Sequence, residues 1–135
     1  MKFKEMPYER IDFEQVQKEL KELMEAFDAA KSGEEQFAIH QKYYKLTGRV
    51  ESMYTIANIR FDVDTSDAFY EKEHEYYDEK MPEYSNACLA YQKKLYESPF
   101  RDYLEKKIGP VAFKNMEIAQ KAMDEKIIPL MQEEN

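Results

Sequence analysis

The amino-acid sequence predicts an all-α fold, an antiparallel bundle of three longer helices followed by shorter ones. Hydrophobic residues recur at alternating spacings of three and four over most of the chain, which is the period of one helix face. The 135 residues include only 3 Gly and 5 Pro, so few positions favour tight turns. No segment alternates hydrophobic and polar residues for long enough to indicate a β-strand.

The first helix is predicted at about residues 12–30. Asp12 is a natural N-cap, Gln15 completes a capping box, and Ile11 and Val16 flank the cap as a hydrophobic staple. One helix face then carries a regular series of hydrophobic residues: Phe13, Val16, Leu20, Leu23 and Phe27.

The second helix is predicted at about residues 33–63, after a capping box formed by Ser32 and Glu35. Its hydrophobic stripe contains Ile39, Tyr43, Leu46, Val50, Met53 and Ala57. Gly48 lies inside this helix, where glycine costs about 1 kcal/mol relative to alanine. We therefore expect a neighbouring helix to approach closely at Gly48.

A turn of sequence D-V-D-T-S-D, residues 62–67, follows the second helix. It resembles the opening of a calcium loop but lacks the glycine and the closing glutamate of an EF-hand. We expect Thr65 or Ser66 to cap the next helix instead, with Asp67 favouring its positive end.

The third helix is predicted at about residues 67–97. Its hydrophobic seam repeats every seven residues at Tyr70, Tyr77, Tyr84 and Tyr91, and between them at His74, Met81, Cys88 and Leu95. Pro82 removes a backbone donor within this helix and should kink it.

Three shorter helices are predicted at about residues 99–108, 110–123 and 125–134. In the helix at 99–108, Ser98 is the expected cap and Pro99 the first helical residue. Gly109 should end this helix, and Pro110 should begin the helix at 110–123. We expect self-association through the last helix, which carries Ile127, Ile128, Leu130 and Met131.

The composition excludes several classes of protein. The net charge of −8 and the absence of a basic stripe argue against nucleic-acid binding. The N-terminus has no hydrophobic core of a signal peptide, and no uninterrupted hydrophobic run reaches membrane-spanning length. A single cysteine, Cys88, suits a reducing compartment, so we expect a cytoplasmic protein with no membrane partner.

The stretch H-E-Y-Y-D at residues 74–78 nearly matches the zinc-binding pattern H-E-x-x-H. We interpret His74 as a seam residue, Asp78 as its partner one turn later, and Glu75 as a solvent-exposed residue. An alternative is a metal-binding bundle that uses His40 and Asp78 together with Glu71 and His74. Cys88 is interpreted as a buried structural thiol, so the sequence predicts neither a catalytic nor a metal-binding residue.

The tyrosine stripe of the third helix is interpreted as core. Aromatic residues off this seam are better candidates for a peptide-facing surface, because tyrosine offers contact area and a polar tip. These candidates are Phe69, Tyr76 and Tyr96.

Three segments, MKFKEMPYERIDFEQV, IANIRFDVDTSDAFYEKE and LYESPFRDYLEKKIG, resemble the N-terminal helical region of oligoendopeptidase F-type zinc peptidases, relatives of thimet oligopeptidase. The likeness covers essentially the whole chain and includes no catalytic motif. It implies that residues 1–135 form a single helical domain at the N-terminus of a longer peptidase that cleaves short peptides. The parent would hold zinc on an H-E-x-x-H helix beyond this chain.

The resemblance implies a non-catalytic role for this chain, as a wall of the substrate channel. Its partners would be the catalytic domain of the same parent and the oligopeptide substrate. The chain itself would need no cofactor and should be inactive alone. An alternative is a free-standing helical module that binds other proteins.

Overall fold

The computed structural model describes residues 6–134, and for residues 126–128 and 133–134 it describes the backbone alone. The helices are α1 (Phe13–Ala29), α2 (Gly33–Val63), α3 (Ala68–Tyr96), α4 (Arg101–Ile108), α5 (Pro110–Ala122) and α6 (Ile128–Glu134). A π-helical turn, η2 (Met123–Ile127), joins α5 to α6. The described residues contain no strand, which confirms the all-α prediction. None of their helices is long and hydrophobic enough to cross a membrane.

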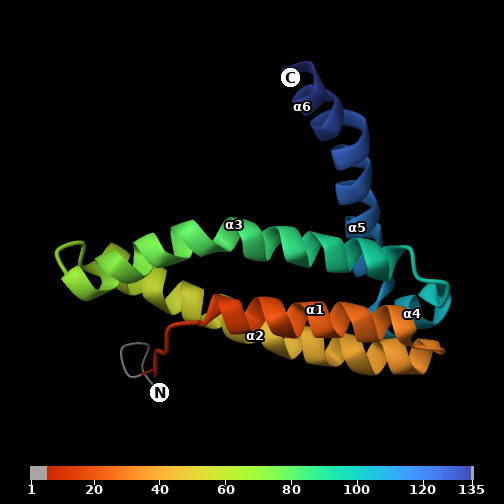
Figure 1. The fold of residues 1–135 in the computed structure, drawn as a ribbon, viewed down its shortest axis with the longest axis horizontal. Helices are drawn as coiled ribbons and strands as arrows, with labels where there is room; N and C mark the ends of the chain where they lie inside the picture. Colours follow the sequence, from red (N-terminus) through yellow and green to blue (C-terminus); the bar gives the residue numbers. More distant parts are fainter. Residues whose placement is uncertain (1–5, 135) are drawn as a thin grey trace.

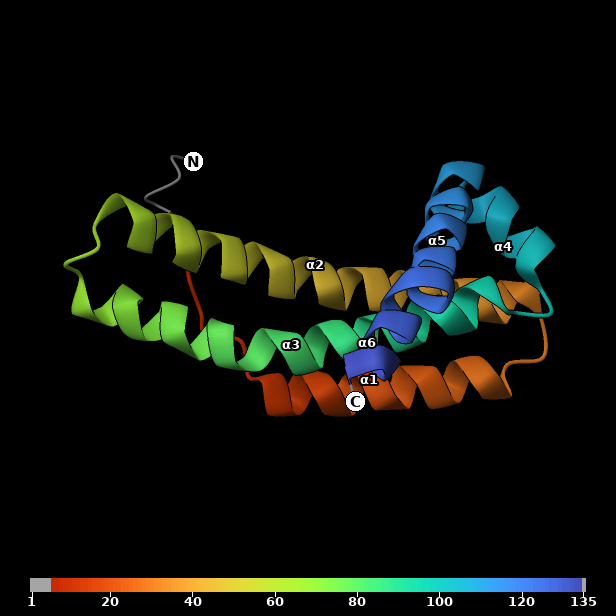
Figure 2. The ribbon, with the colours of Figure 1, turned by 90° about the horizontal axis from the view of Figure 1, so that it is seen from above.

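The three long helices lie side by side and pack against one another in pairs (Figure 1). α1 has 17 residues, whereas α2 has 31 and α3 has 29. α1 therefore covers only one half of the α2–α3 pair, and the N-terminal segment before it contacts the other half. Figure 2 shows α4 and α5 at the opposite end of the bundle from the α2–α3 turn.

The predicted hydrophobic faces form the core. The α3 seam confirms the seven-residue pattern, since Tyr77, Tyr84 and Tyr91 are buried and pack edge-on against phenylalanine rings of α1. Tyr91 also stacks face to face on Tyr43 of α2, with ring centroids 3.7 Å apart. α3 continues through Pro82 to Tyr96.

Two helix starts follow from local sequence. The Asp12 carboxylate accepts a hydrogen bond from the Gln15 amide at 3.2 Å, and the Ser32 hydroxyl accepts one from the Glu35 amide at 3.1 Å. The Glu35 carboxylate in turn accepts from the Lys31 amide at 2.9 Å. Both predicted caps are therefore confirmed.

Two other predicted starts are wrong. The N-cap of α3 is Asp67, whose carboxylate accepts from the Phe69 amide at 2.9 Å, rather than Thr65 or Ser66. α4 begins at Arg101 rather than Pro99, because Pro99 lies in a turn that precedes the helix. The Ser98 hydroxyl holds that turn by accepting from the Phe100 amide at 3.0 Å.

The prediction for Gly48 is also wrong, because a Cβ atom there would meet nothing within 4 Å. The close approach occurs at Gly33, where a Cβ atom would lie 2.7 Å from a ring carbon of Tyr103. This contact seats α4 on the first turn of α2. The absent side chain of Gly33 thus allows an approach that any other residue would obstruct.

α5, η2 and α6 form one continuous rod that projects away from the bundle (Figure 1). We call residues 110–134 the arm. The sequence predicted a break between two helices near residue 124. In the structure the helix is continuous there, through the wider π turn η2. Pro129 explains the wider turn, because proline cannot donate to the carbonyl of residue 125 and its ring crowds that carbonyl.

Candidate functional site

The H-E-Y-Y-D stretch does not form a metal site. His74 Nδ1 lies 3.1 Å from the Asn58 side-chain oxygen, and Nε2 lies 3.3 Å from an Asp78 carboxylate oxygen. The imidazole also stacks on Phe61, with centroids 4.5 Å apart. Both ring nitrogens have side-chain partners, and Glu75 is exposed. The interpretation of His74 and Asp78 as an ordinary one-turn pair is confirmed.

The alternative metal-binding bundle does not form among the described residues. His40 Nδ1 lies 2.9 Å from the Tyr91 hydroxyl. On α3, Tyr91 and His74 are almost five helical turns apart, which is about 25 Å at the α-helical rise. The two imidazoles therefore cannot share an ion. No group of three or more His, Cys, Asp or Glu side chains in the described part of the chain could hold a metal.

The three residues predicted to face a peptide lie in different places. Phe69 is 56% exposed near the start of α3, where it packs edge-on against Tyr8. Tyr76 contacts α1 and the N-terminal segment, since its hydroxyl donates to the Ile11 carbonyl at 2.6 Å. Tyr96 lies at the far end of α3, about 40 Å from Phe69 along the helix. The structure therefore does not join them into one surface.

Tyr96 does line a groove between α3 and α5, of about 240 Å³. The guanidinium of Arg101 lies 4.3 Å from the centre of its ring. The opposite side of this groove is formed by residues of α5 and η2: Met116, Ala119, Gln120, Met123 and Asp124. Tyr96 is thus a peptide-facing candidate with a groove beside it.

Sequence reasoning missed a buried polar cluster around Glu73. Glu73 is 1% exposed, and its carboxylate accepts hydrogen bonds from the guanidinium of Arg10, at 2.9 Å from Nε, and from the Tyr8 hydroxyl at 2.7 Å. The Arg10 guanidinium also lies 4.2 Å from the centre of the Tyr76 ring. The Tyr77 hydroxyl completes the cluster, 3.1 Å from that of Tyr8.

Opposing effects determine the ionisation of this cluster. Burial disfavours the charged form of Glu73, but the hydrogen bonds from Arg10 and Tyr8 outweigh it and hold the pKa of the carboxyl below its usual value. Burial, together with hydrogen bonds to Tyr77 and Glu73, raises the pKa of Tyr8. Glu73 is therefore a charged group inside the protein, paired with a cation from another segment.

The cluster did have a sequence signal. Glu73 stands three residues after Tyr70 and four before Tyr77, so it lies on the same helical stripe as the seam. A carboxylate on a buried stripe requires a partner. The two residues that provide it, Tyr8 and Arg10, lie in the segment before the first helix cap, where no periodic pattern draws attention to them.

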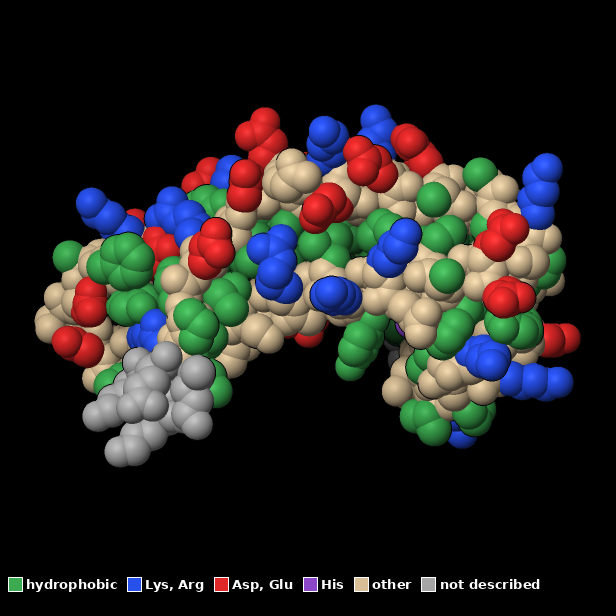
Figure 3. Space-filling view, turned by 90° about the horizontal axis from the view of Figure 1, so that it is seen from below, with side chains coloured by type: hydrophobic (Ala, Val, Ile, Leu, Met, Phe, Trp, Pro, Cys, Tyr) green, Lys and Arg blue, Asp and Glu red, His purple; other side chains and the backbone are tan. Residues whose placement is uncertain are grey.

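A second groove, of about 480 Å³, lies between α1 and α2. Its hydrophobic lining is Leu23 and Leu46. Charged residues border it, acidic on α1 and basic on α2: Glu19, Glu22, Lys42, Lys45 and Arg49. Figure 3 shows this face, with hydrophobic side chains visible between acidic and basic ones. Charged and hydrophobic surface combined in this way can receive an amphipathic segment.

A family model described as the peptidase M3 N-terminal domain matches residues 3–123. The chain belongs to the peptidase M3 N-terminal domain family. The match spans the whole three-helix bundle, α4 and α5.

Solved structures agree with membership of the peptidase M3 N-terminal domain family. A crystal structure described as an oligoendopeptidase F superposes with a TM-score of 0.82 at 35% identity, covering 87% of this chain and 21% of that one. A structure described as an oligoendopeptidase F from Bacillus anthracis superposes with a TM-score of 0.82 at 33% identity. The superposition covers 87% of this chain and 22% of that one. A structure of PZ peptidase A with an inhibitor superposes with a TM-score of 0.82 at 33% identity. The superposition covers 86% of this chain and 21% of that one.

The chain thus spans about a fifth of the length of these structures, at 21–22% of each chain. A comparison with curated proteins found no match. The M3 N-terminal domain seen here is a helical domain with a buried ion pair, two grooves and a projecting arm.

Proposed function

We propose that this chain is the non-catalytic N-terminal domain of an oligoendopeptidase F-like zinc metallopeptidase that hydrolyses short peptides. The observation that carries the proposal is the superposition on solved oligoendopeptidase F structures, which covers 87% of this chain but only about a fifth of theirs. The catalytic domain and the zinc would belong to the remaining part of the parent.

In this proposal, the domain forms a wall of the substrate channel. The three long helices support such a role, because α2 extends for about 45 Å at the α-helical rise and presents long, continuous faces. Phe69, Tyr76 and Tyr96 remain the candidates for contact with an oligopeptide. The whole of residues 1–135 would act as one domain, in the cytoplasm, as the single Cys88 favours.

A peptidase assay tests the proposal. The 135-residue chain should cleave no fluorogenic oligopeptide, with or without added zinc, while intact Bacillus anthracis oligoendopeptidase F serves as the positive control. Cleavage by the chain alone that depends on zinc and stops with a chelator would overturn the non-catalytic assignment.

Complementation tests the proposed partnership. The Bacillus anthracis enzyme truncated to remove the region that superposes on this chain should bind the chain in a pull-down and regain part of its peptidase activity. Failure to bind, although the truncated enzyme remains folded by circular dichroism, would argue against assembly with such a catalytic domain.

A further inference from the structure

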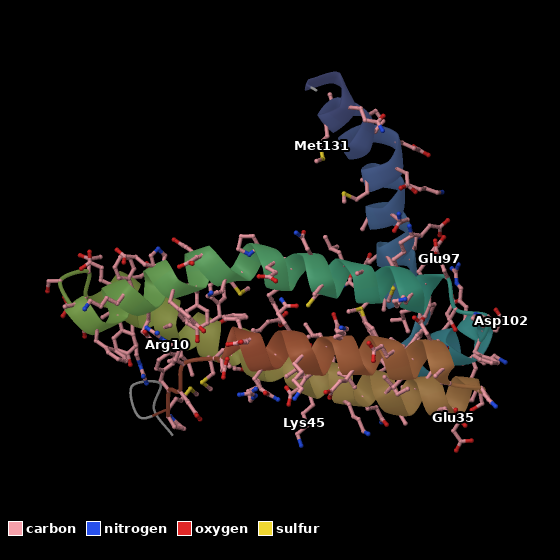
Figure 4. The ribbon with its side chains drawn as sticks, in the orientation of Figure 1. Arg10, Glu35, Lys45, Glu97, Asp102 and Met131 are labelled. Atoms are coloured by element: carbon pink, nitrogen blue, oxygen red, sulfur yellow. The ribbon has the colours of Figure 1, made fainter. Side chains whose placement is uncertain are left out.

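The groove between α1 and α2 lies on the face of this helix pair that points away from α3. All the residues that line it come from α1 and α2, although α3 packs on both helices. Figure 4 shows Lys45, on the wall of the groove, pointing away from the bundle on the side opposite to α3. The pair therefore holds one helix on one face and has a hollow of about 480 Å³ on the other.

This groove continues beyond α1 along the same face of α2. Arg49 lines both the groove and a second hollow of about 430 Å³, whose other side is formed by residues 7–9 of the N-terminal segment. Met53 lines this second hollow, and its sulfur lies 3.5 Å from the Glu9 backbone nitrogen. From Lys42 to Met53 the combined groove follows α2 for about 16 Å, or three helical turns.

The two walls of the combined groove carry opposite charges. The α2 wall is basic and consists of Lys42, Lys45 and Arg49. The opposite wall is acidic and consists of Glu9, Glu19 and Glu22. Hydrophobic residues lie between the two rows: Leu23, Leu46 and Met53. None of the charged side chains in the two rows has an ion pair or a hydrogen bond among the described residues. The hollow thus separates two rows of opposite charge that an occupant can pair with.

A helix fits the shape of this groove better than a flat surface does. The valley between two packed helices is where a third helix seats its side chains. Hydrophobic residues on one face of such a helix would reach Leu23 and Leu46, and three turns would span the groove. A second copy that presented the same groove would instead leave two hollows facing each other, without the contacts that close packing provides.

The charges of the walls define the flanks of that helix. Acidic residues along one flank would lie beside the basic wall of α2, and basic residues along the other flank beside the acidic wall. A helix with two acidic or two basic flanks would meet like charge on one wall. A nucleic acid carries charge of a single sign, so the acidic wall would repel it.

We infer that the combined groove binds a helix of a partner protein, and that this helix carries a hydrophobic stripe between one acidic and one basic flank. The bound helix lies along α2 and completes a four-helix arrangement with α1, α2 and α3. Binding of such a partner is independent of the proposed peptidase role.

A labelled peptide tests this binding on the 135-residue protein. The probe is a helical peptide of about 18 residues with leucines on one face, glutamates along one flank and lysines along the other. Either flank can carry the glutamates, because turning the helix end to end exchanges its flanks. Fluorescence anisotropy measures the affinity at about 0.15 M salt, where screening limits the attraction of distant charges.

Two comparison peptides carry lysines on both flanks or glutamates on both flanks. The mixed peptide should bind most tightly, because it alone matches both walls. The protein has a net charge of −8, so non-specific attraction would favour the peptide with two lysine flanks instead. A parent protein that prefers the peptide with two lysine flanks therefore overturns the inference.

Reversing the charges of the basic wall should change the ranking of the peptides. In Lys45→Glu/Arg49→Glu, the affinity for the mixed peptide should fall about tenfold or more, since ion pairs are replaced by repulsions. The peptide with two lysine flanks should become the best ligand of this variant. Both residues are exposed, so the variant should keep the circular dichroism spectrum of the parent.

A matched control changes the net charge by the same amount outside the groove. Lys72→Glu/Lys114→Glu reverses two other exposed lysines and should keep the ranking of the parent. An unchanged ranking in the folded Lys45→Glu/Arg49→Glu variant overturns the inference. A ranking that changes equally in the control overturns it too.

The self-association predicted through the last helix concerns a different surface. Leu130 and Met131 are each 59% exposed, whereas the side chains of Ile127 and Ile128 lie outside the described residues. That association stays a prediction, and it would survive the charge reversal in the groove.

Two further measurements address other occupants of the groove. In competition, the truncated Bacillus anthracis enzyme should not displace the mixed peptide. Displacement would mean that the catalytic part of a parent covers the groove, and it would overturn the assignment to a partner protein. In sedimentation, Lys45→Glu/Arg49→Glu should have the same mass as the parent. Self-association of the parent that disappears in this variant would mean that a second copy occupies the groove, and it would equally overturn the assignment.

Discussion

Arg10 and Glu73, which are 63 residues apart in the sequence, form a two-pronged ion pair that holds the N-terminal segment on α3. The Glu73 side chain is 2% exposed, while that of Arg10 is 49% exposed. α1 is too short to cover the whole of α3, so this pair secures the chain over the half that α1 leaves open. The pair therefore links the ionisation of one buried carboxyl to the position of the N-terminal segment.

Replacing Glu73 should destabilise the protein. Glu73→Gln keeps the shape of the side chain but removes the charge that Arg10 and Tyr8 recognise, and we expect a loss of about 2 kcal/mol in the free energy of unfolding. The estimate is moderate because Arg10 can still reach water. Urea denaturation followed by circular dichroism measures it. Glu75→Gln, an exposed change on the same helix, is the control and should have little effect; equal losses in the two variants would refute the role of the pair.

The stabilisation by Glu73 should depend on pH. Its pKa in the folded protein lies below the ordinary value of 4.5, so its contribution is complete above about pH 4.5 and is lost as the pH falls through the folded pKa. The difference in urea midpoint between the parent and Glu73→Gln should therefore be constant near neutral pH and shrink in acid. A difference that grows on acidification would show that the sign is wrong.

His40 should make stability pH-dependent in a higher range. Burial lowers the pKa of this imidazole below its ordinary value of 6.5, so the unfolded chain takes up a proton there before the folded protein does. Protonation also removes the lone pair that Nδ1 can offer to the Tyr91 hydroxyl. The free energy of unfolding should fall as the pH drops below about 6.5.

His40→Gln tests the source of this effect. The variant should lose most of the pH dependence between neutral pH and the range where carboxyl groups titrate. His74→Gln is the matched control, since it removes the other histidine of the chain. If the two variants alter the pH dependence to the same degree, His40 is not the responsible group.

Replacing each of the two glycines of α2 by alanine should change the stability of the protein in opposite directions. Gly33→Ala would place a Cβ atom 2.7–2.8 Å from three carbons of Tyr103, so we expect a loss of about 1–3 kcal/mol as α4 is displaced. Gly48→Ala meets no atom within 4 Å, and it should stabilise the helix by about 1 kcal/mol. Thermal unfolding of both variants checks this. Destabilisation by Gly48→Ala would contradict the open space around this position.

The helix pattern could be predicted because its causes are local. Asp12 and Ser32 cap helices through amides three residues ahead, and the α3 seam is a repeat within one helix. The prediction of the α3 cap was wrong because neighbouring residues could each cap the same helix. Asp67 rather than Ser66 caps α3, because the Ser66 hydroxyl donates to the Asp64 carboxylate at 2.5 Å.

The polar contacts between helices could not be predicted in the same way. Gln36 is buried because its side chain donates to the Phe27 carbonyl at 3.1 Å and accepts from the Ser98 hydroxyl, so three separate segments meet at one amide. Nothing in the neighbouring residues of Gln36 indicates these partners. Their positions depend on how α1, α2 and the start of the α4 turn are packed.

Local sequence patterns are enough to predict the all-α class, the order and approximate bounds of the helices, and the face that each long helix buries. These properties follow from the spacing of residues within a few helical turns. The packing of the helices sets which glycine accepts a close contact, which cation pairs with the buried charge of Glu73, and the direction of the arm away from the bundle. These properties depend on residues tens of positions apart, whose proximity arises only when the helices have packed.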